Sequence, residues 1–115
     1  MKFAVLVAIL ADDLEEQAID SARSAGAGGV TILDARGMGG EEKKTFLGLT
    51  YEGSQSALVF VLERKLSVAV LKRMTRDLDL ASSSKGVVFT VPIEHIAGID
   101  LAQVEQFESR ILDQL

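Results

Sequence analysis

Leu58-Val59-Phe60-Val61-Leu62 is an unbroken run of apolar residues, and Phe3-Ala4-Val5-Leu6-Val7 is a second one. Both runs are short and rich in β-branched and aromatic residues, which is typical of buried strands. Successive side chains of a strand point to opposite faces of a sheet, so strands without polar positions need cover on both faces. A chain of 115 residues has few elements to spare for this. We therefore expect copies of the chain to associate through the sheet.

The rest of the chain predicts two further strands and three helices. Leu66, Val70 and Met74 recur at helical spacing, and Asp12 followed by Glu15 fits a capping box at a helix start. We expect strands at 3–11, 30–35, 57–62 and 86–91, helices at 12–25, 63–78 and 100–115, and long loops at 36–56 and 79–85.

This order of elements predicts the fold class. Two right-handed β-α-β halves of this length close into an α+β, ferredoxin-like βαββαβ sandwich, in which both helices cover one face of a four-stranded antiparallel sheet. The segment 100–115 adds a C-terminal helix. The length fits one domain, and we expect residues 1–115 to form it.

Composition excludes several functions. The net charge of −5 argues against non-specific nucleic-acid binding. The absence of cysteine and the single histidine exclude thiolate and multi-histidine metal sites within one chain. We find no constellation of catalytic residues and expect no enzyme. The apolar run at 3–11 is shorter than the ~20 residues that span a bilayer, so we expect a cytoplasmic protein without membrane insertion.

Three segments remain as candidate sites, each with a simpler structural explanation. Ser82-Ser83-Ser84-Lys85-Gly86 could bind an anion through hydroxyls, N–H groups and one ammonium, or could only connect a helix to a strand. Loop 36–56 could present charges to a partner, or be a solvated surface. His95, next to Glu94, is either a structural residue or, repeated around an axis, part of a metal or pH-sensitive site.

Two stretches of the sequence carry a family resemblance. In Gly29–Gly39 a threonine lies on the predicted second strand, and Gly37-Met38-Gly39 opens the long loop. In Gly86–Glu94 a phenylalanine precedes Pro92-Ile93-Glu94. Both stretches resemble the corresponding parts of the PII nitrogen-regulatory signalling proteins. The resemblance as a whole covers roughly residues 2–99.

The resemblance implies a trimer with inward-facing sheets, clefts between subunits that bind adenine nucleotides, and loop 36–56 as the equivalent of the T-loop that contacts a target enzyme, transporter or regulator. The candidate effector contacts are Thr31, Arg36, Gly37, Gly39, Ser84, Lys85 and Gly86. The candidate partner-docking residues are Lys43, Lys44, Phe46 and Tyr51.

The chain also departs from the family pattern at its cations. Ser84-Lys85-Gly86-Val87 replaces a Gly-Asp-Gly-Lys run, Ala57 replaces a lysine, Glu41 replaces a glutamine, and residues 96–99 hold no arginine. A triphosphate needs several cations or N–H groups to replace its hydration. The resemblance implies an adenine nucleotide as cofactor. Because several of the family's cations are absent, we expect ATP to bind weakly.

The same topology also fits a different class of protein. A CutA-like or ACT-like oligomer that binds a metal or another small molecule would share the sheet, the helices and the need for association. The composition disfavours the metal-binding variant.

Overall fold

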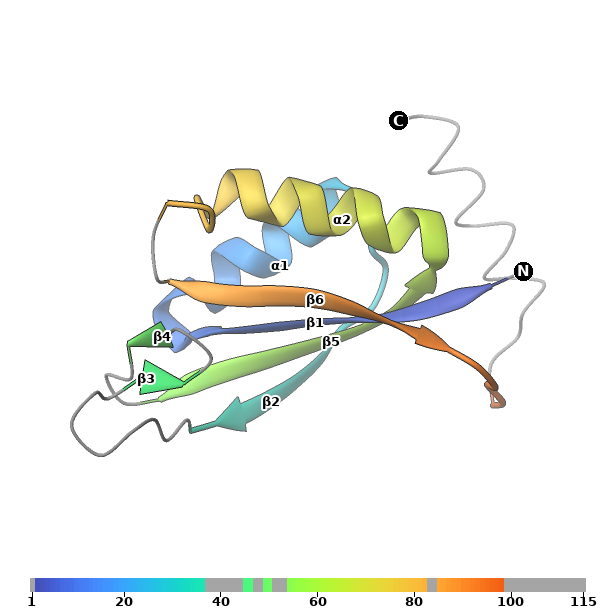
Figure 1. Ribbon diagram of the computed structural model, residues 1–115, viewed down its shortest axis with the longest axis horizontal. Coiled ribbons are helices and arrows are strands. Elements are labelled where there is room, and N and C mark those ends of the chain that lie inside the picture. The colour runs from blue at the N-terminus through green and yellow to red at the C-terminus, as the bar shows by residue number, and fades with distance from the viewer. Residues whose placement is uncertain (1, 37–44, 47–48, 51–53, 83–84, 99–115) are drawn as a thin grey trace.

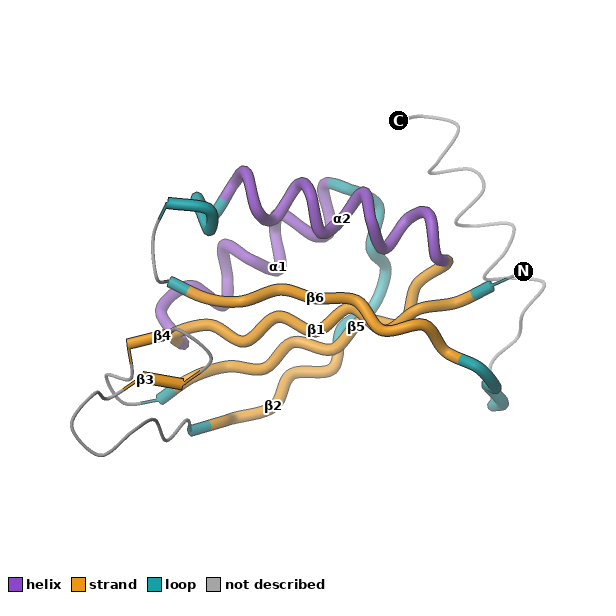
Figure 2. Tube along the Cα trace, viewed as in Figure 1, coloured by secondary structure: helices purple, strands orange, loops and turns teal. Residues whose placement is uncertain are grey.

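The computed structural model describes residues 2–36, 45–46, 49–50, 54–82 and 85–98 (Figure 1). Its main sheet consists of β1 (Phe3–Ala11), β2 (Thr31–Ala35), β5 (Gln55–Glu63) and β6 (Gly86–Ile93). The strands are antiparallel and lie in the order β2-β5-β1-β6. Helices α1 (Glu15–Ser24) and α2 (Arg64–Asp77) lie together on one face (Figure 2). The predicted ferredoxin-like βαββαβ fold is confirmed.

The remaining strands and the ends of the elements differ in part from the sequence prediction. Within the long loop, the short strands β3 (Thr45–Phe46) and β4 (Leu49–Thr50) pair with each other. The helix predicted at 100–115 lies outside the described residues. Strand β6 extends through Pro92, where the sequence predicted its end; β6 is an edge strand, and proline is tolerated on edges.

The N-terminal ends of α1 and α2 are capped in different ways. Glu63 caps α2 as its carboxylate accepts hydrogen bonds from the backbone N–H groups of Lys65, at 2.9 Å, and Leu66, at 3.1 Å. The capping box predicted at Asp12 is wrong. A 3-10 turn, η1 (Asp12–Leu14), precedes α1 without a side-chain cap. Glu15 instead accepts a hydrogen bond of 2.6 Å from the hydroxyl of Ser56, a buried group that requires a partner.

The face of the sheet beneath the helices holds the core. Every second residue of β1 and β5 points there. Leu66, Val70 and Met74 of α2 and small residues of α1 pack against them. Alanines on α1 allow close approach to the sheet. The core residues include Leu6, Ala8, Leu10, Ala18, Ala22, Leu58, Phe60, Leu62, Leu66, Val70 and Met74.

The opposite face, here called the open face, is also apolar. Neither α1 nor α2 covers it (Figure 1). The register of the strands places Val5, Val7, Ile9, Leu33, Ala57, Val59, Val61, Val87, Phe89 and Val91 on it. Val61 is 44%, Phe89 37% and Val91 48% exposed. The sequence prediction that both faces are apolar is therefore confirmed, while only one face is covered by the two helices.

Candidate functional site

The candidate effector residues gather at one end of the sheet. Here β1 and β2 end and β5 and β6 begin, so that the long loop and the loop before β6 emerge together (Figure 1). This end is called the loop end below. Arg36 directly follows β2, and Lys85 directly precedes β6; both are exposed.

A hollow of about 370 Å³ lies beside Arg36 at the loop end. Asp12, Asp34, Ala35 and Ser54 form the rest of its lining. A backbone hydrogen bond of 3.3 Å from the Asp12 N–H to the Ser54 carbonyl joins two of the segments around it. The lining therefore includes two acidic residues and one arginine. Within the described residues this charge balance suits a ligand with few negative charges better than a polyphosphate.

Gly86 is fixed at its position by close packing. A Cβ atom there would lie 2.4 Å from Cδ2 of Leu10 and 3.0 Å from the carbonyl oxygen of Ile9. The glycine lets β6 begin tightly against β1, and this places Lys85 at the sheet edge.

The two halves of the candidate site lie on opposite edges of the sheet. Arg36 follows the edge strand β2, and Lys85 precedes the other edge strand, β6. Three inter-strand spacings separate these edges, or about 14 Å. One chain therefore does not bring the two predicted halves together, although both lie at the loop end.

Thr31 lies apart from the other effector candidates. It begins β2, pairs with Val59 in the middle of the sheet, and is exposed on the side of the open face. Arg36 is five positions further along the extended chain, which corresponds to roughly 16 Å. The structure thus places Thr31 on the open face, away from the hollow.

Several predicted residues cannot be placed. Of the partner-docking candidates, Phe46 lies in β3, paired with Leu49. The remaining candidates that lie outside the described residues are Gly37, Gly39, Lys43, Lys44, Tyr51 and Ser84.

The sequence matches the family model of nitrogen regulatory protein P-II over residues 3–102. The chain belongs to the P-II family. The match spans both β-α-β halves and the loop between them, so it includes every described residue of the candidate site. Among the curated proteins, no sequence matches significantly.

Solved P-II-like structures share the fold of this P-II chain at low identity. CPII from Thiomonas intermedia, bound to ADP and bicarbonate, is 22% identical with a TM-score of 0.61, over 81% of this chain and 87% of CPII. A signaling protein described as PII-like, from Thermus thermophilus, is 19% identical with a TM-score of 0.56, over 81% of this chain and 90% of the other. A further CPII structure holds ADP, AMP and acetate.

The hollow of this P-II chain contains residues that no sequence motif marks as functional. Asp12 was assigned to helix capping, and neither Asp34 nor Ser54 was singled out. Their proximity depends on the register that sets Ala35 opposite Gln55 and Gln55 opposite Ala11. No local pattern in the sequence carries that information.

His95, the residue considered for a metal or pH-sensitive site, lies on the surface. His95 and Glu94 are more than 90% exposed, with the imidazole Nε2 3.8 Å from a Glu94 carboxylate oxygen. No group of three or more histidine, aspartate or glutamate side chains is placed to hold a metal ion among the residues described.

No helix in the described part of the P-II chain is long and apolar enough to cross a membrane.

Proposed function

We propose that this P-II family chain is a non-enzymatic regulator of the cytoplasm. Copies assemble through their open faces as a trimer, a small anionic or nucleotide effector binds in the clefts between copies, and the segment 37–55 contacts a target protein. The observation that carries the proposal is the apolar open face, flanked at its loop end by the two separated halves of a site.

The open face supports the assembly on energetic grounds. Burial of apolar surface stabilises by about 25 cal/mol per Å². Val61, Phe89 and Val91 are more than a third exposed in the single chain and lie in one continuous patch across β5, β1 and β6. Large exposed apolar patches mark interaction surfaces. Association of identical patches removes this surface from water without any further partner.

Assembly also explains why the candidate effector residues lie on opposite edges. In a closed ring of copies, the β2 edge of one chain approaches the β6 edge of its neighbour. Arg36 of one copy and Lys85 of the next would then face a shared cleft, which neither copy forms alone. The effector would bind at this cleft and change the ordering of loop 37–55, which shifts the population of target-competent states.

The charges at the loop end guide the choice of effector. Asp12 and Asp34 beside Arg36 disfavour a ligand with many negative charges. The CPII structures hold ADP or AMP together with bicarbonate or acetate. We therefore propose an adenine nucleotide with fewer phosphates than ATP, or a small carboxylate-like anion, as the effector.

Titration calorimetry with ATP, ADP, AMP and cyclic AMP, with and without 2-oxoglutarate and bicarbonate, tests this proposal. We expect ADP or AMP to bind more tightly than ATP, and Arg36→Gln and Lys85→Gln each to weaken binding by about tenfold. Arg23→Gln, on α1, is the matched control and keeps the affinity. Silence of every ligand would contradict effector sensing and leave only the docking role.

A further inference from the structure

The outer surface of α2 is unusual in charge. Its exposed residues are Arg64, Lys65, Val68, Lys72 and Arg76. None of them is acidic or neutral-polar, and the single apolar member, Val68, is 45% exposed. Because these positions recur at about one helical turn, they form one continuous row, called the α2 stripe below.

The neighbouring helix shows that this charge is not a general property of the surface. The exposed residues of α1 are Glu16, Gln17, Asp20, Arg23 and Ser24. The chain as a whole has a net charge of −5, yet five of its 12 lysines and arginines fall within the 14 residues of α2. The helix layer therefore carries a basic helix beside an acidic one.

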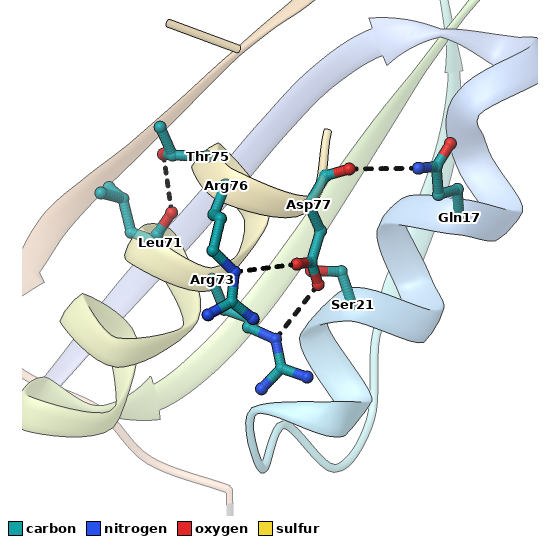
Figure 3. A network of polar contacts seen from close by, with 7 residues as sticks. All are labelled: Gln17, Ser21, Leu71, Arg73, Thr75, Arg76 and Asp77. Carbon is teal, nitrogen blue, oxygen red and sulfur yellow. Dashed lines mark hydrogen bonds and ion pairs between the residues drawn. The ribbon is translucent and has the colours of Figure 1, made fainter. Parts of the chain in front are cut away.

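Asp77, the one carboxylate of α2, neutralises only one end of the helix. Its carboxylate accepts hydrogen bonds from Nε of Arg73, at 3.1 Å, from Nε of Arg76, at 3.2 Å, and from the hydroxyl of Ser21 on α1, at 2.9 Å (Figure 3). Gln17 donates to the Asp77 carbonyl at 3.2 Å.

The other cations of the stripe have no acidic partner among the described residues. No hydrogen bond or ion pair joins the side chain of Arg64, Lys65 or Lys72 to any other described residue. Within the part of the chain that the structure describes, three free cations thus surround Val68.

The stripe leads into a hollow at the start of α2, at the end of the sheet away from the loop end. This hollow has a volume of about 360 Å³. Its lining is mixed: Phe3, Pro92, Ile93 and Ile96 are apolar, Lys2 and Arg64 are cationic, and Glu94 is acidic. The hollow offers space for an apolar side chain next to the cations.

We propose that the α2 stripe is a docking surface for an acidic helical segment of a partner protein. Lys65 and Lys72 lie two turns apart, about 10.5 Å along the helix. A partner helix with two carboxylates at the same spacing and an apolar residue between them meets both ammonium groups and Val68. This surface lies on the helix layer, so it is separate from the open face and from the clefts that we propose there.

Other occupants fit the stripe less well. In the assembly proposed above, the helix layers of the copies point outward in different directions. A flat membrane could then contact only one stripe at a time, which disfavours a membrane as the occupant. Three free cations on a chain of net charge −5 provide few phosphate contacts for a nucleic acid. The segment 99–115 of the same chain is acidic but also contains Leu101, Val104, Phe107, Ile111 and Leu115, and a stripe with a single valine offers little apolar surface for so many apolar side chains.

Fluorescence anisotropy of the full chain with a labelled acidic peptide tests the proposal. The probe is a helical peptide of about 20 residues with glutamates seven positions apart and a leucine between them, in about 150 mM salt. We expect Lys65→Gln with Lys72→Gln to weaken binding by about tenfold. Arg23→Glu on α1 changes the net charge by the same −2 and leaves affinity within about twofold. A peptide with glutamine in place of glutamate binds weakly.

Three results would overturn the proposal. The first is an equal loss of peptide affinity in Arg23→Glu and in the double variant. The second is tighter binding of phosphatidylserine vesicles or duplex DNA than of the peptide. The third is the absence of peptide binding. Zero-length crosslinking with a carbodiimide adds an independent readout. Amide links from Lys65 or Lys72 to the peptide support docking of a partner, and links to carboxylates of residues 99–115 show that the chain's own C-terminal segment occupies the stripe.

Discussion

The two faces of the sheet have nearly the same apolar composition but differ in what covers them. On the helix face, Leu6 and Phe60 are at most 1% exposed beneath α1 and α2. On the open face, Val61 and Val91 are 44% and 48% exposed. Because strands alternate their side chains, both faces come from the same few segments of sequence. The comparison shows that the helix face forms the core of the single chain, whereas the open face keeps apolar side chains exposed. This exposed surface is where we propose that copies of the chain associate.

The largest expected effect is on the helix face. Phe60→Ala removes a fully buried ring from the core and lowers the free energy of unfolding by about 3–5 kcal/mol. Urea unfolding followed by circular dichroism measures it. Phe89→Ala on the open face is the paired variant, and its cost depends on protein concentration because association buries that ring. Equal, concentration-independent losses would remove the distinction between the faces.

Charge on the open face is expected to break the assembly. Val61→Asp places a carboxylate in the proposed interface and weakens association by about 3 kcal/mol. Val68→Asp on α2 is a close control, because Val61 is 44% and Val68 45% exposed in the single chain. Analytical ultracentrifugation should show dissociation for Val61→Asp alone. Dissociation by both variants, or by neither, would contradict the role of the open face.

A smaller effect is expected where β6 begins. Gly86→Ala forces a Cβ atom against Leu10 and the backbone of Ile9, and we expect a loss of about 1–3 kcal/mol together with weaker effector binding. Gly29→Ala is the control, since a Cβ atom there has no neighbour within 4 Å. Thermal unfolding of the two variants compares them. Equal stability of the two would show that β6 does not require close packing against β1.

The smallest effect concerns the polar contact between the helices. The Ser21 hydroxyl, followed by the guanidinium groups of Arg76 and Arg73, lowers the pKa of the Asp77 carboxyl. A pKa that is lower in the folded state contributes stability above the unfolded value near 3.9, and this is lost as the pH falls through the folded value.

Unfolding as a function of pH measures this contribution. Asp77→Asn should be less stable than the native chain near neutral pH, and the difference should vanish in acid below the lowered pKa. Asp20→Asn, on the exposed side of α1, is the control for the loss of one carboxylate. A difference for Asp77→Asn that persists unchanged in acid would contradict the electrostatic origin.

Much of the fold could be predicted from the sequence because it depends on local patterns. The apolar runs located the four main strands, and Leu66, Val70 and Met74 located α2. The start of α1 was missed because the carboxylate of Glu15 bonds to Ser56, which is 41 positions away in the chain.

The candidate site was harder to predict. Lys85 follows from the candidate anion loop and Arg36 from the family resemblance, but their positions on opposite edges follow from the strand order. The hollow that unites Asp12, Asp34 and Ser54 follows from the register of three strands. The α2 stripe, in contrast, is readable from helical spacing once burial shows which side of the helix faces outward.

The mass of the native chain in solution tests the central claim most directly. Light scattering coupled to size exclusion at about ten micromolar should give about 37 kDa, three times the 12.3 kDa of one chain. A folded species of 12.3 kDa at that concentration would show that the open face is not closed by other copies, and would contradict the proposed clefts between them.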